Sequence, residues 1–427
     1  MNFRKIVKAF IPRSLFRKIE PVGHLGESIL FNSLNSFPGR KFKVIGVTGT
    51  NGKTTTAFLI HKMLHEAGYK VGLMTTVAYG AGDKLKIPPD HYTNVPAPLM
   101  MRRLKEIKDG GAEWLVMEVT SMALAQNRVW GVPFQIAVMT NISQDHLDYH
   151  KTMENYINAK VKLFRLTNKN AKGTKTGVIN ADDKTANKFI SAIKNSKTYG
   201  IRSGDLQAKN IELSAAGVAY KATTDEETYD IRCRIPGRFN VYNSLAAIQV
   251  GRVMGLNKHQ IEQGIASLEA VAGRMTSLSS KSGFSVIVDF AVTPDALENV
   301  LTASRELTKG KIILVFGATG DRDKLKRPIM GGVAVKNADQ IFLTDDETYT
   351  EDPAAIIKAV YKGIEAAGGQ NKTTIVEDRL DAIKTALETA KKGDTVILTG
   401  MGHLTTRNMG GKEQAWDEIE IVKKLIK

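Results

Sequence analysis

Residues 44–60, VIGVTGTNGKTTTAFLI, join two apolar runs through a turn that contains two glycines, a lysine and three threonines. A strand that ends in such a turn and leads into a helix forms an anion site, because backbone N–H groups converge on phosphate oxygens. Lys53 would reach the terminal phosphates of a nucleotide, and the Thr54 hydroxyl would bind a phosphate-bound Mg²⁺. The predicted nucleotide-binding residues here are Gly49, Thr50, Asn51, Gly52, Lys53, Thr54 and Thr55.

One position departs from the strict phosphate-loop pattern. That pattern has a glycine five residues before Gly52, and this chain has Val47 there. A glycine-rich turn that binds nothing is the alternative interpretation. The apolar runs on both sides indicate a strand followed by a helix, and this context favours the phosphate site.

The elements that would position this turn alternate between short apolar runs and longer helical stretches. Continuous apolar strands separated by helices are typical of a mostly parallel sheet covered on both faces. Helices are expected at 54–68, 97–111 and 153–166. Strands are expected at 43–49, 70–76, 113–121, 135–143 and 176–183.

A second series with the same alternation begins after Gly273. Before it, residues 199–236 lose the helical rhythm, and 217–235 read as a small antiparallel patch followed by a helix at 241–254. We therefore predict an α/β protein with a phosphate-loop central domain, built on a mostly parallel sheet, and a C-terminal Rossmann-like α/β domain. The predicted domains are a short basic segment at 1–42, a central domain at 43–272 and a C-terminal domain at 273–427.

Composition bounds the class of protein. The 427 residues exceed what one ordinary core holds, and 42% apolar with 24% charged residues indicates a soluble globular chain. Cys233 is the only cysteine, which excludes an internal disulfide framework and is compatible with a reducing cytoplasm. The sequence contains no run of 18 apolar residues, so no membrane-spanning helix is predicted. The net charge of +16 suits polyanionic partners without choosing among them, and a solvated basic surface is the simpler explanation.

The first 20 residues are more basic than the rest, with one anion, Glu20. Phe3, Ile6, Val7 and Phe10 share a helical face. Such a helix could make weak contact with a membrane surface, but docking on the protein's own body is the interpretation we favour. The six cations of this segment are Arg4, Lys5, Lys8, Arg13, Arg17 and Lys18.

The string GVTGTNGKTTT resembles the phosphate loop of the Mur ligase family, whose members form amide bonds with ATP. The similarity runs from about residue 43 to about residue 405 and is greatest to the members that add the third amino acid of the peptidoglycan stem. It implies a cytoplasmic ligase of cell-wall biosynthesis with ATP and Mg²⁺ as cofactors. Further blocks agree in order: MEVTSMAL, TNISQDHLDYHKTMENYINAKVKLF, GRFNVYNSLAAI, VDFAVTPDALENVL and FGATGDRDKLKRPIMG.

The family's chemistry activates a carboxylate, because hydroxide is too poor a leaving group for direct condensation with an amine. ATP phosphorylates the carboxylate, and the amine then displaces phosphate. Cations must suppress the repulsion between the two anions that meet. The resemblance implies catalytic roles for Lys53, His146 and Lys160. It implies metal binding by Thr54, Glu118, His146 and Lys160, the lysine as a carbamate formed with CO₂.

Further residues match nucleotide and substrate positions of the family. Asn240 and Asn243 would contact adenine, Arg274 the phosphates after domain closure, and Asp289 a ribose hydroxyl. A helix N-terminal hydrogen bond for Asn243 and a surface ion pair for Arg274 are the alternatives. Arg322 would hold the carboxylate of the incoming amino acid, since its fork binds both oxygens. The predicted acceptor-binding residues, any of which could be an ordinary surface polar group, are Thr93, Asn94, Thr120, Gln126 and Arg128.

Departures from the family pattern concern substrate recognition. About 43 residues precede the phosphate loop, too few for the UDP-binding domain that the family carries there. Met122 and Val292 replace histidines, and Leu404 replaces a glutamate that contacts the amino acid's far ammonium. Glu347 and Tyr349 replace the asparagine and arginine that hold the distal end of diaminopimelate. We therefore expect retained activation chemistry with changed substrates, and Glu347 could pair with a lysine-like ammonium.

Three alternatives remain open. A folylpolyglutamate-synthase-like ligase also has a short segment before its loop, although that loop usually reads GTNGKGS. A nucleotide-binding regulator that has lost catalysis would explain the substitutions at Met122, Val292 and Leu404. A nucleic-acid motor is disfavoured because no helicase-type companion motifs are present. We expect small-molecule substrates, no nucleic-acid partner and a monomer.

Overall fold

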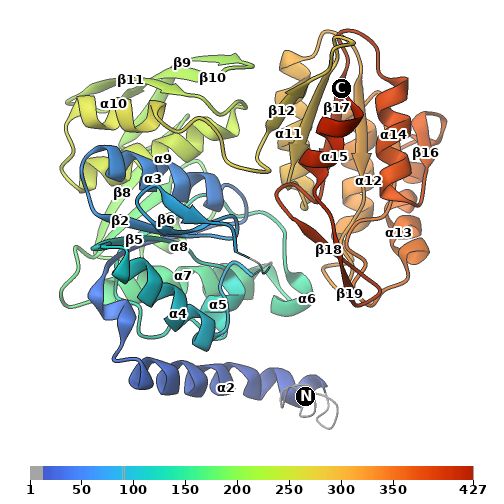
Figure 1. Cartoon of the computed structure of the whole chain (residues 1–427). Helices are drawn as coiled ribbons and strands as arrows, with labels where there is room; N and C mark the ends of the chain where they lie inside the picture. The colour runs from blue at the N-terminus through green and yellow to red at the C-terminus, as the bar shows by residue number, and fades with distance from the viewer. Residues whose placement is uncertain (1–12, 89, 91, 427) are drawn as a thin grey trace. The chain divides into compact units, whose positions relative to one another are not determined.

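The computed structural model describes residues 13–88, 90 and 92–426. The chain folds into two compact units (Figure 1). Unit 1 comprises the residues up to Ile142 together with Glu154–Gln207 and Leu245–Gly264. Unit 2 comprises Ser143–Met153, Ala208–Ser244 and Ile265–Lys427. Because both units are assembled from separate segments, the predicted domain boundary at residue 272 stays a prediction.

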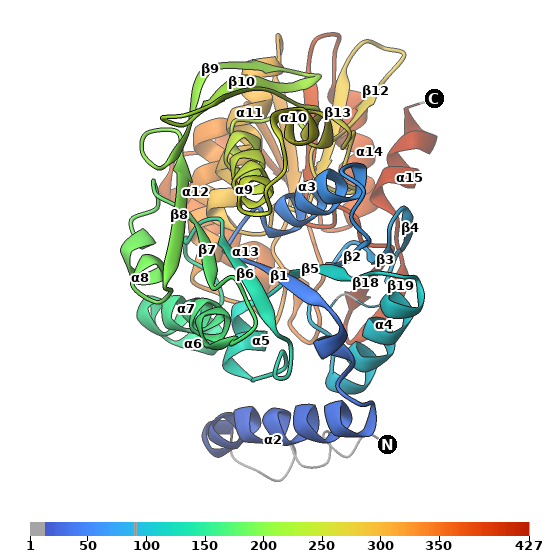
Figure 2. The same cartoon turned by 90° about the vertical axis from the view of Figure 1, so that its left-hand side faces the viewer.

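The first sheet is parallel at its centre. β1 (Lys43–Thr48) lies between β5 (Trp114–Glu118) and β6 (Phe134–Met139), with β2 (Val71–Met74) beyond β5. On the other side, β7 (Thr176–Asn180) continues the parallel pairing from β6. The strand order among the described residues is β11-β10-β9-β8-β7-β6-β1-β5-β2-β3-β4 (Figure 2). The prediction of a mostly parallel sheet is confirmed.

Antiparallel strands lie toward the edges of this sheet. β2 pairs antiparallel with β3, and β3 pairs antiparallel with β4. β10 and β11 also pair antiparallel, which confirms the patch predicted at 217–235. β8 remains parallel to β7. The bounds are β3 (Tyr79–Ala81), β4 (Lys84–Lys86), β8 (Asn195–Gly200), β9 (Leu206–Ser214), β10 (Gly217–Thr223) and β11 (Thr228–Cys233).

Helices cover both faces of the central strands, which is why these strands are apolar at nearly every position. Val44 and Leu115 pack in one cluster with α4 (Ala97–Asp109) and α7 (Met153–Lys169). α3 (Lys53–Glu66) contacts β1, β2 and β5 from the opposite face (Figures 1 and 2). Between β5 and residue 270, the other helices are α5 (Ser121–Ala125), α6 (Leu147–His150), α8 (Ala186–Ile190), α9 (Phe239–Val253) and α10 (Lys258–Ala266).

The first described helix, α2 (Arg13–Leu34), docks on unit 1, where it contacts α4. Ser28 Oγ donates to Asn127 O over 3.2 Å, and Asn32 Nδ2 donates to Trp130 O over 3.1 Å. A short 3₁₀ helix, η1 (Pro38–Lys41), then leads into β1. Residues 1–12, which carry most of the predicted basic helix, lie outside the described residues. None of the described helices has the length and apolar character needed to cross a membrane.

The second sheet confirms the α/β series predicted after Gly273. Its strand order is β12-β13-β17-β14-β15-β16, with β12 antiparallel to β13 and the other pairs parallel. Its strands are β12 (Thr276–Ser279), β13 (Ser285–Asp289), β14 (Ile312–Phe316), β15 (Gln340–Leu343), β16 (Thr373–Ile375) and β17 (Thr395–Thr399).

Alternate residues of these strands enter two separate cores. Ile287 and Leu314 pack with one set of helices, and Val286 and Val315 pack with another. The first set is α11 (Pro294–Leu307), α12 (Lys326–Asn337) and α13 (Pro353–Ala366), and the second is α14 (Arg379–Thr389) and α15 (Glu418–Leu425). Three short elements complete the unit: η2 (Gln370–Lys372), β18 (Thr406–Met409) and β19 (Lys412–Ala415).

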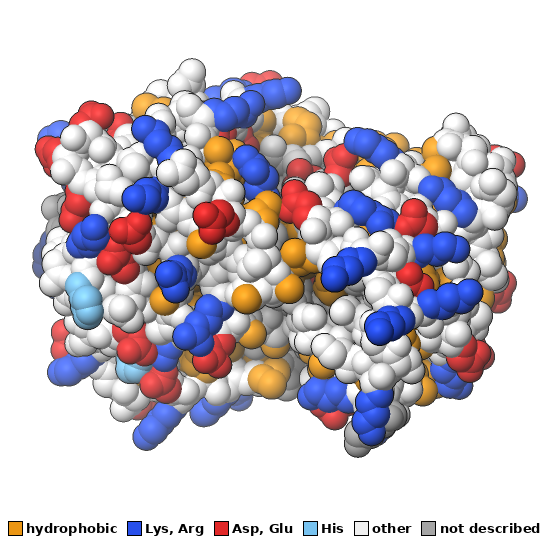
Figure 3. Space-filling view, turned by 90° about the horizontal axis from the view of Figure 1, so that it is seen from above, with side chains coloured by type: hydrophobic (Ala, Val, Ile, Leu, Met, Phe, Trp, Pro, Cys, Tyr) orange, Lys and Arg blue, Asp and Glu red, His pale blue; other side chains and the backbone are white. Residues whose placement is uncertain are grey.

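The basic charge is dispersed over the face of the chain that Figure 3 presents. Figure 3 shows Lys and Arg side chains interspersed with Asp and Glu over the face that it presents. No single stripe of cations is visible there, so the +16 charge reads on this face as a solvated basic surface.

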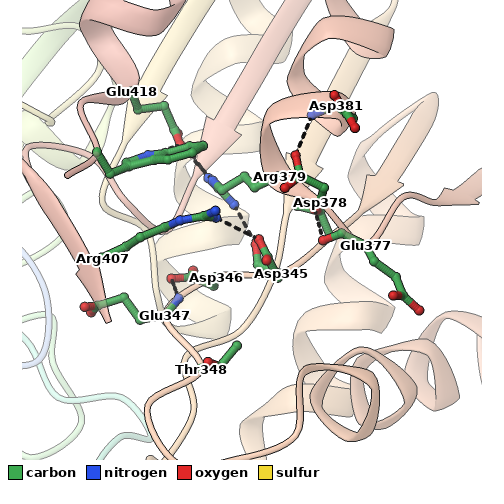
Figure 4. Close-up of polar contacts among 12 residues, drawn as sticks. Asp345, Asp346, Glu347, Thr348, Glu377, Asp378, Arg379, Asp381, Arg407 and Glu418 are labelled. Atoms are coloured by element: carbon green, nitrogen blue, oxygen red, sulfur yellow. Dashed lines mark hydrogen bonds and ion pairs between the residues drawn. The ribbon is translucent and has the colours of Figure 1, made fainter. Parts of the chain in front are cut away.

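A buried ion pair joins α14 to α15 in unit 2 (Figure 4). Arg379 and Glu418 are both 0% exposed, and the guanidinium donates to the carboxylate twice, over 2.7 Å and 3.0 Å. Arg379 Nη2 also donates to Thr399 O over 2.7 Å. Trp416 Nε1 donates to Glu418 Oε2 over 3.3 Å. These bonds tie the end of β17 to the last helix of the unit.

We predict that Glu418→Ala lowers the free energy of unfolding of unit 2 by about 3–5 kcal/mol, because it leaves a buried arginine without its counter-charge. Urea unfolding of the full chain measures this, with Trp416 fluorescence as the reporter in a Trp114→Phe/Trp130→Phe background. The matched control is Glu420→Ala on the same helix, whose pair with Lys423 is about half exposed. The control should cost less than about 1 kcal/mol, and equal effects of the two variants would contradict the prediction.

Candidate active site

The turn between β1 and α3 is held in place by the segment that follows β6. Thr50 N donates to Asn141 O over 2.8 Å, and Asn51 N donates to Asn141 Oδ1 over 3.0 Å. Thr140 Oγ1 donates to Asn51 O over 2.6 Å. The sequence reasoning did not identify Thr140 and Asn141, because they lie about 90 positions after the turn they hold.

Gly49 makes the closest approach between the turn and that segment. A Cβ atom on Gly49 would lie 1.8 Å from Thr140 Oγ1, so no larger residue fits without displacement. Gly52 caps α3 with φ 79°, and Lys53 is the first helical residue. Lys53 Nζ donates to Thr50 O over 2.7 Å. The predicted phosphate-binding residues thus form one strand–turn–helix unit whose first helical N–H groups suit an anion.

Glu118 lies at the centre of a cluster of side-chain oxygens beside this turn. It ends β5, is 3% exposed, and accepts from Thr54 Oγ1 over 3.0 Å at Oε2. Thr76 donates to the same oxygen through its N and Oγ1, over 3.4 Å and 3.5 Å. Thr93 Oγ1 lies 2.6 Å from Thr76 Oγ1. Thr54, Glu118 and Thr93 were predicted site residues, and Thr76, two residues after the end of β2, was missed.

This cluster fits a magnesium ion carried on nucleotide phosphates. Hydroxyl and carboxylate oxygens are the donors that Mg²⁺ prefers, and one or two protein oxygens suffice when phosphates and waters complete the octahedron. Thr54 and Glu118 supply that set. Among the described residues, no group of three or more His, Cys, Asp or Glu side chains is arranged to hold a metal ion.

Lys160 lies beneath the phosphate turn. Its side chain projects from α7, is 2% exposed, and its Nζ donates to Gly49 O over 2.6 Å. The ammonium also lies 4.6 Å from the centre of the Tyr156 ring. The Tyr156 hydroxyl is 3.0 Å from Thr50 Oγ1. The position predicted for chemical modification is therefore packed against the nucleotide loop itself.

His146 lies in a different segment from Glu118 and Lys160. It caps α6 in a left-handed conformation, φ 54°, within the part of unit 2 that spans Ser143–Met153. Its Nε2 lies 3.3 Å from Asp145 Oδ2. Glu118 and Lys160 belong to unit 1, so the role of His146 as a metal ligand stays a prediction.

The predicted acceptor residues hold one another in the segments after β4 and β5. Asn94 Nδ2 donates to Glu118 O over 2.8 Å, and Asn94 Oδ1 accepts from Thr120 N over 2.8 Å. Arg128 Nη1 donates to Asn94 O over 3.2 Å. Gln126 is 4% exposed, and its Oε1 has no hydrogen-bond partner among the described residues. The structure thus brings Asn94, Thr120 and Arg128 together next to the Glu118 cluster.

The two asparagines predicted to contact adenine bond to each other at the start of α9. Asn243 Nδ2 donates to Asn240 Oδ1 over 2.8 Å, and Asn240 Nδ2 donates to Pro236 O over 2.7 Å. Both side chains are buried. These bonds match the alternative of a hydrogen bond near the helix N-terminus, and the adenine contact stays a prediction.

Asp289 is buried at the end of β13 next to Arg274. Its Oδ2 accepts from Met275 N over 2.8 Å. Burial raises the pKa of the Asp289 carboxyl to about 6, and the nearby Arg274 only partly opposes this. The Arg274 guanidinium also stacks over the Phe290 ring, 5.0 Å from its centre. A carboxyl at a strand end can accept a hydroxyl hydrogen bond, as predicted for a ribose.

The segment after β15 carries the residues predicted to recognise the amino acid (Figure 4). Glu347 Oε1 accepts from Asn408 N over 3.1 Å, and Glu347 Oε2 accepts from Tyr349 Oη over 3.2 Å. The Arg322 guanidinium lies 4.8 Å from the centre of the Tyr349 ring. Arg322 therefore contacts Tyr349, and Tyr349 contacts Glu347. Asn408 of β18 contacts Glu347 as well.

Asp346 adds a second buried carboxyl to this segment. It is 2% exposed, its Oδ1 accepts from Glu347 N over 2.6 Å, and burial raises its pKa to about 6 despite the attraction of Arg379. A Cβ on Gly400 would lie 2.1 Å from Asp346 Oδ2. Arg407 pairs with the neighbouring Asp345 over 3.1 Å (Figure 4). Three carboxyl groups, those of Asp345, Asp346 and Glu347, therefore lie in this segment. The two arginines nearby, Arg379 and Arg407, already form ion pairs.

Comparison with known families gives two consecutive matches. Residues 47–251 match the family described as "Mur ligase middle domain", and residues 273–402 match "Mur ligase, glutamate ligase domain". Among curated proteins, the "UDP-N-acetylmuramoyl-L-alanyl-D-glutamate--2,6-diaminopimelate ligase" of Clostridium botulinum is 40% identical over 405 residues, 94% of this chain and 81% of that protein. The protein of the same name from Bacillus velezensis is 38% identical over 93% of this chain and 81% of its own length.

Solved structures share the fold. A structure of a UDP-N-acetylmuramoyl-L-alanyl-D-glutamate--2,6-diaminopimelate ligase matches with a TM-score of 0.62 and 29% identity, over 96% of this chain and 82% of that one. A folylpolyglutamate synthase of Mycobacterium tuberculosis, complexed with ADP and AMPPCP, matches with a TM-score of 0.73 and 16% identity, over 88% and 92%. The second likeness is one of fold alone.

We predict that Gly49→Ala weakens binding of magnesium–ATP, because the new methyl group displaces either the turn or Thr140. Overpacking of this kind costs about 1–3 kcal/mol, which corresponds to about 5- to 150-fold in affinity. Titration calorimetry measures it. Gly332→Ala is the control, since a Cβ there meets nothing within 4 Å. Unchanged affinity in Gly49→Ala would show that the turn does not bind the nucleotide.

We also predict a pH-dependent contribution of Asp289 to stability. Between about pH 4 and 6 the unfolded carboxyl ionises while the folded one stays protonated, because the pKa of Asp289 in the fold is about 6. The folded state then binds more protons, so this term lowers the free energy of unfolding as pH rises through that window. Asp289→Asn should remove the term.

Urea unfolding at pH 4, 5 and 6 measures this slope in both proteins. The control is Asp225→Asn in the exposed turn between β10 and β11, which should keep the wild-type slope. The same slope in Asp289→Asn as in the wild type would contradict the prediction.

Proposed function

This chain belongs to the Mur ligase family, ATP-dependent enzymes that form amide bonds in peptidoglycan synthesis, and we propose that it extends the peptide of a cell-wall precursor by one amino acid. The acceptor carboxylate oxygen attacks the γ-phosphorus of ATP, and ADP leaves. The amine nitrogen then attacks the carbonyl carbon of the acyl phosphate. Inorganic phosphate leaves, and the nitrogen loses a proton.

The phosphate turn carries this proposal. Its glycines and the start of α3 present N–H groups to the phosphates, and Lys53 lies at the first helical position to neutralise the terminal ones. A bound nucleotide would compete with Thr50 O for the Lys53 ammonium. The γ-phosphorus would then lie near the Glu118 cluster, where the carboxylate would approach.

Thr54 and Glu118 would hold Mg²⁺. The ion would supply charge neutralisation between the phosphate and the carboxylate. Thr76 keeps the Glu118 carboxylate oriented through two hydrogen bonds. His146 would be a further ligand.

Lys160 would act as a carbamate. The ammonium first loses a proton, and the neutral amine nitrogen then bonds to the carbon of CO₂ with loss of a second proton, so that a cation becomes an anion. The lysine is buried and lies against Gly49 and Tyr156, away from bulk water. An anion at that place would bind or support a metal ion beside the nucleotide loop.

The acceptor would be a nucleotide-linked muropeptide, as in the relatives' printed name. Thr93, Asn94, Thr120, Gln126 and Arg128 would contact it from the loops next to Glu118. Met122 and Val292, which replace histidines of the family pattern, lie among the blocks that carry substrate contacts. The reaction would take place in the cytoplasm, where ATP is available, on a monomeric enzyme.

The incoming amino acid would carry a second ammonium and no second carboxylate. Arg322 would bind the α-carboxylate. Glu347 and the buried Asp346 present acceptors beyond it, and Tyr349 replaces the arginine that a distal carboxylate would need. A lysine-like diamino acid satisfies these groups better than diaminopimelate does.

A folylpolyglutamate ligase is the second candidate, and the sequence relatives disfavour it. The solved synthase shares only the fold, at 16% identity. The three threonines after Lys53 also fit its usual loop less well. Release of ADP that depends on folate and glutamate would overturn our choice.

Product masses test the proposed function. The purified chain is incubated with ATP, Mg²⁺, uridine-linked muropeptides and a pool of amino acids. We expect a product heavier than a muropeptide by one diamino acid residue. Tight ATP binding without turnover under any amine would instead support a regulator.

We predict that Lys160→Ala lowers turnover by about 100-fold, as for other groups that stabilise transition-state charge. Added short-chain carboxylic acids should restore part of the rate, because they can supply the missing anion. Lys169→Ala, an exposed lysine of the same helix, should keep the wild-type rate. Lys53→Ala should lose turnover without rescue. Normal turnover in Lys160→Ala would remove the carbamate from the mechanism.

A further inference from the structure

The helix α2 has two faces of different character. Its inward face carries polar buried side chains, among them His24, Ser28 and Asn32. Besides the two side-chain bonds to unit 1 described above, Asn127 Nδ2 donates to Pro21 O over 3.4 Å. Polar hydrogen bonds therefore fasten α2 to unit 1, so its other face points outward whatever the enzyme binds.

The outward face is apolar. Five of the eleven large hydrophobic side chains that are exposed among the described residues belong to this single helix. Their spacing places all five within one arc of the helix, and Gly23 and Gly26, also exposed, lie between them. A soluble helix normally turns such a stripe toward its own core. The five are Ile19 (42% exposed), Val22 (70%), Ile29 (41%), Leu30 (54%) and Leu34 (68%).

The charge of the N-terminal segment indicates which kind of partner the apolar stripe contacts. The first 20 residues of the sequence contain six cations and one anion, and the first apolar residue of the stripe is Ile19. Two anions of the helix, Glu20 and Glu27, are not on the stripe: both lie within 4 Å of the inward-facing His24, at 3.9 Å and 3.4 Å. The stripe itself therefore carries no negative side chain.

From this arrangement we propose that α2 docks the protein on an anionic lipid bilayer. The aliphatic side chains enter the boundary between headgroups and acyl chains, and the basic residues of the N-terminal segment pair with lipid phosphates. A second copy of the chain fits less well, because the cations of two N-terminal segments would repel at a shared interface. The proposal does not depend on which substrates the active site takes.

Vesicle sedimentation of the full chain tests the proposal. We expect binding to vesicles of phosphatidylglycerol and phosphatidylcholine, at least about tenfold weaker binding to phosphatidylcholine alone, and weakening with added salt. Ile29→Asp/Leu30→Asp should reduce binding at least about tenfold, because it puts two anions on the stripe. The matched control, Ile375→Asp/Leu425→Asp, changes two aliphatic side chains that are also exposed, at 46% and 41%, and should bind as the wild type does.

A fluorescent label gives a second readout that does not require a disruptive variant. Cys233 is the only cysteine and is 1% exposed, and burial raises its pKa to about 11, so a surface thiol will label selectively. An environment-sensitive dye on Val22→Cys should brighten and shift to the blue with anionic vesicles. The same dye on Ile375→Cys should not change.

Three results would overturn the proposal. One is no binding to anionic vesicles at low salt. Another is equal binding by the wild type and Ile29→Asp/Leu30→Asp. The third is a concentration-dependent dimer in sedimentation velocity, lost in that variant, with no change of the Val22 label on vesicles; this result would assign the stripe to a second copy of the chain.

Discussion

The hydrogen bonds between the 49–52 turn and the segment after β6 support the rest of the site. The N–H groups of Thr50 and Asn51 donate to Asn141, so the shape of the turn is held from outside, and the N–H groups at the start of α3 are the ones that suit phosphates. Asn141 and Thr140 hold the turn through the backbone of Thr50 and Asn51. The same parallel sheet places β5 next to β1, which brings Glu118 within hydrogen-bond distance of Thr54.

In unit 2, a buried charged side chain is neutralised by a second charged side chain of the same unit. At the end of its sheet, Arg379 is wholly buried and is matched by Glu418 and by backbone carbonyls. This network fixes the end of β17 and the start of the segment that carries Asp346. The carboxyl groups of this segment are consequently held in place by the network.

The phosphate turn and the segment after β15 are held by different neighbours. At the turn, Asn51 is hydrogen-bonded to Asn141 after β6 and Thr54 to Glu118 of β5, so a change in either neighbour disturbs the turn. In the segment after β15, Glu347 is held by the backbone N–H of Asn408 and by the Tyr349 hydroxyl. The two regions are therefore stabilised by separate sets of hydrogen bonds.

The sequence by itself determined the alternation of strands and helices, both sheets, and the phosphate turn, because these follow from local hydrophobic period, glycine positions and chain order. It did not predict α12 or α15, and α12 shows why. Two glycines and a proline give α12 a low helix propensity, yet a Cβ on Gly331 would lie 2.4 Å from Val360 O of α13. The close packing of the two helices requires the glycine that local propensity penalises.

The site was predicted in part for the same reason. Lys53, Thr54, Glu118 and Lys160 stand in recognisable strings, whereas Thr76, Asn141 and Asn408 became visible only once distant strands were paired. The outward face of α2 also needed the structure, since the sequence shows a helix with apolar residues but not which of its faces is already covered. Helices, strands and turns are determined by neighbouring residues, whereas contacts between residues tens of positions apart depend on how the sheets assemble.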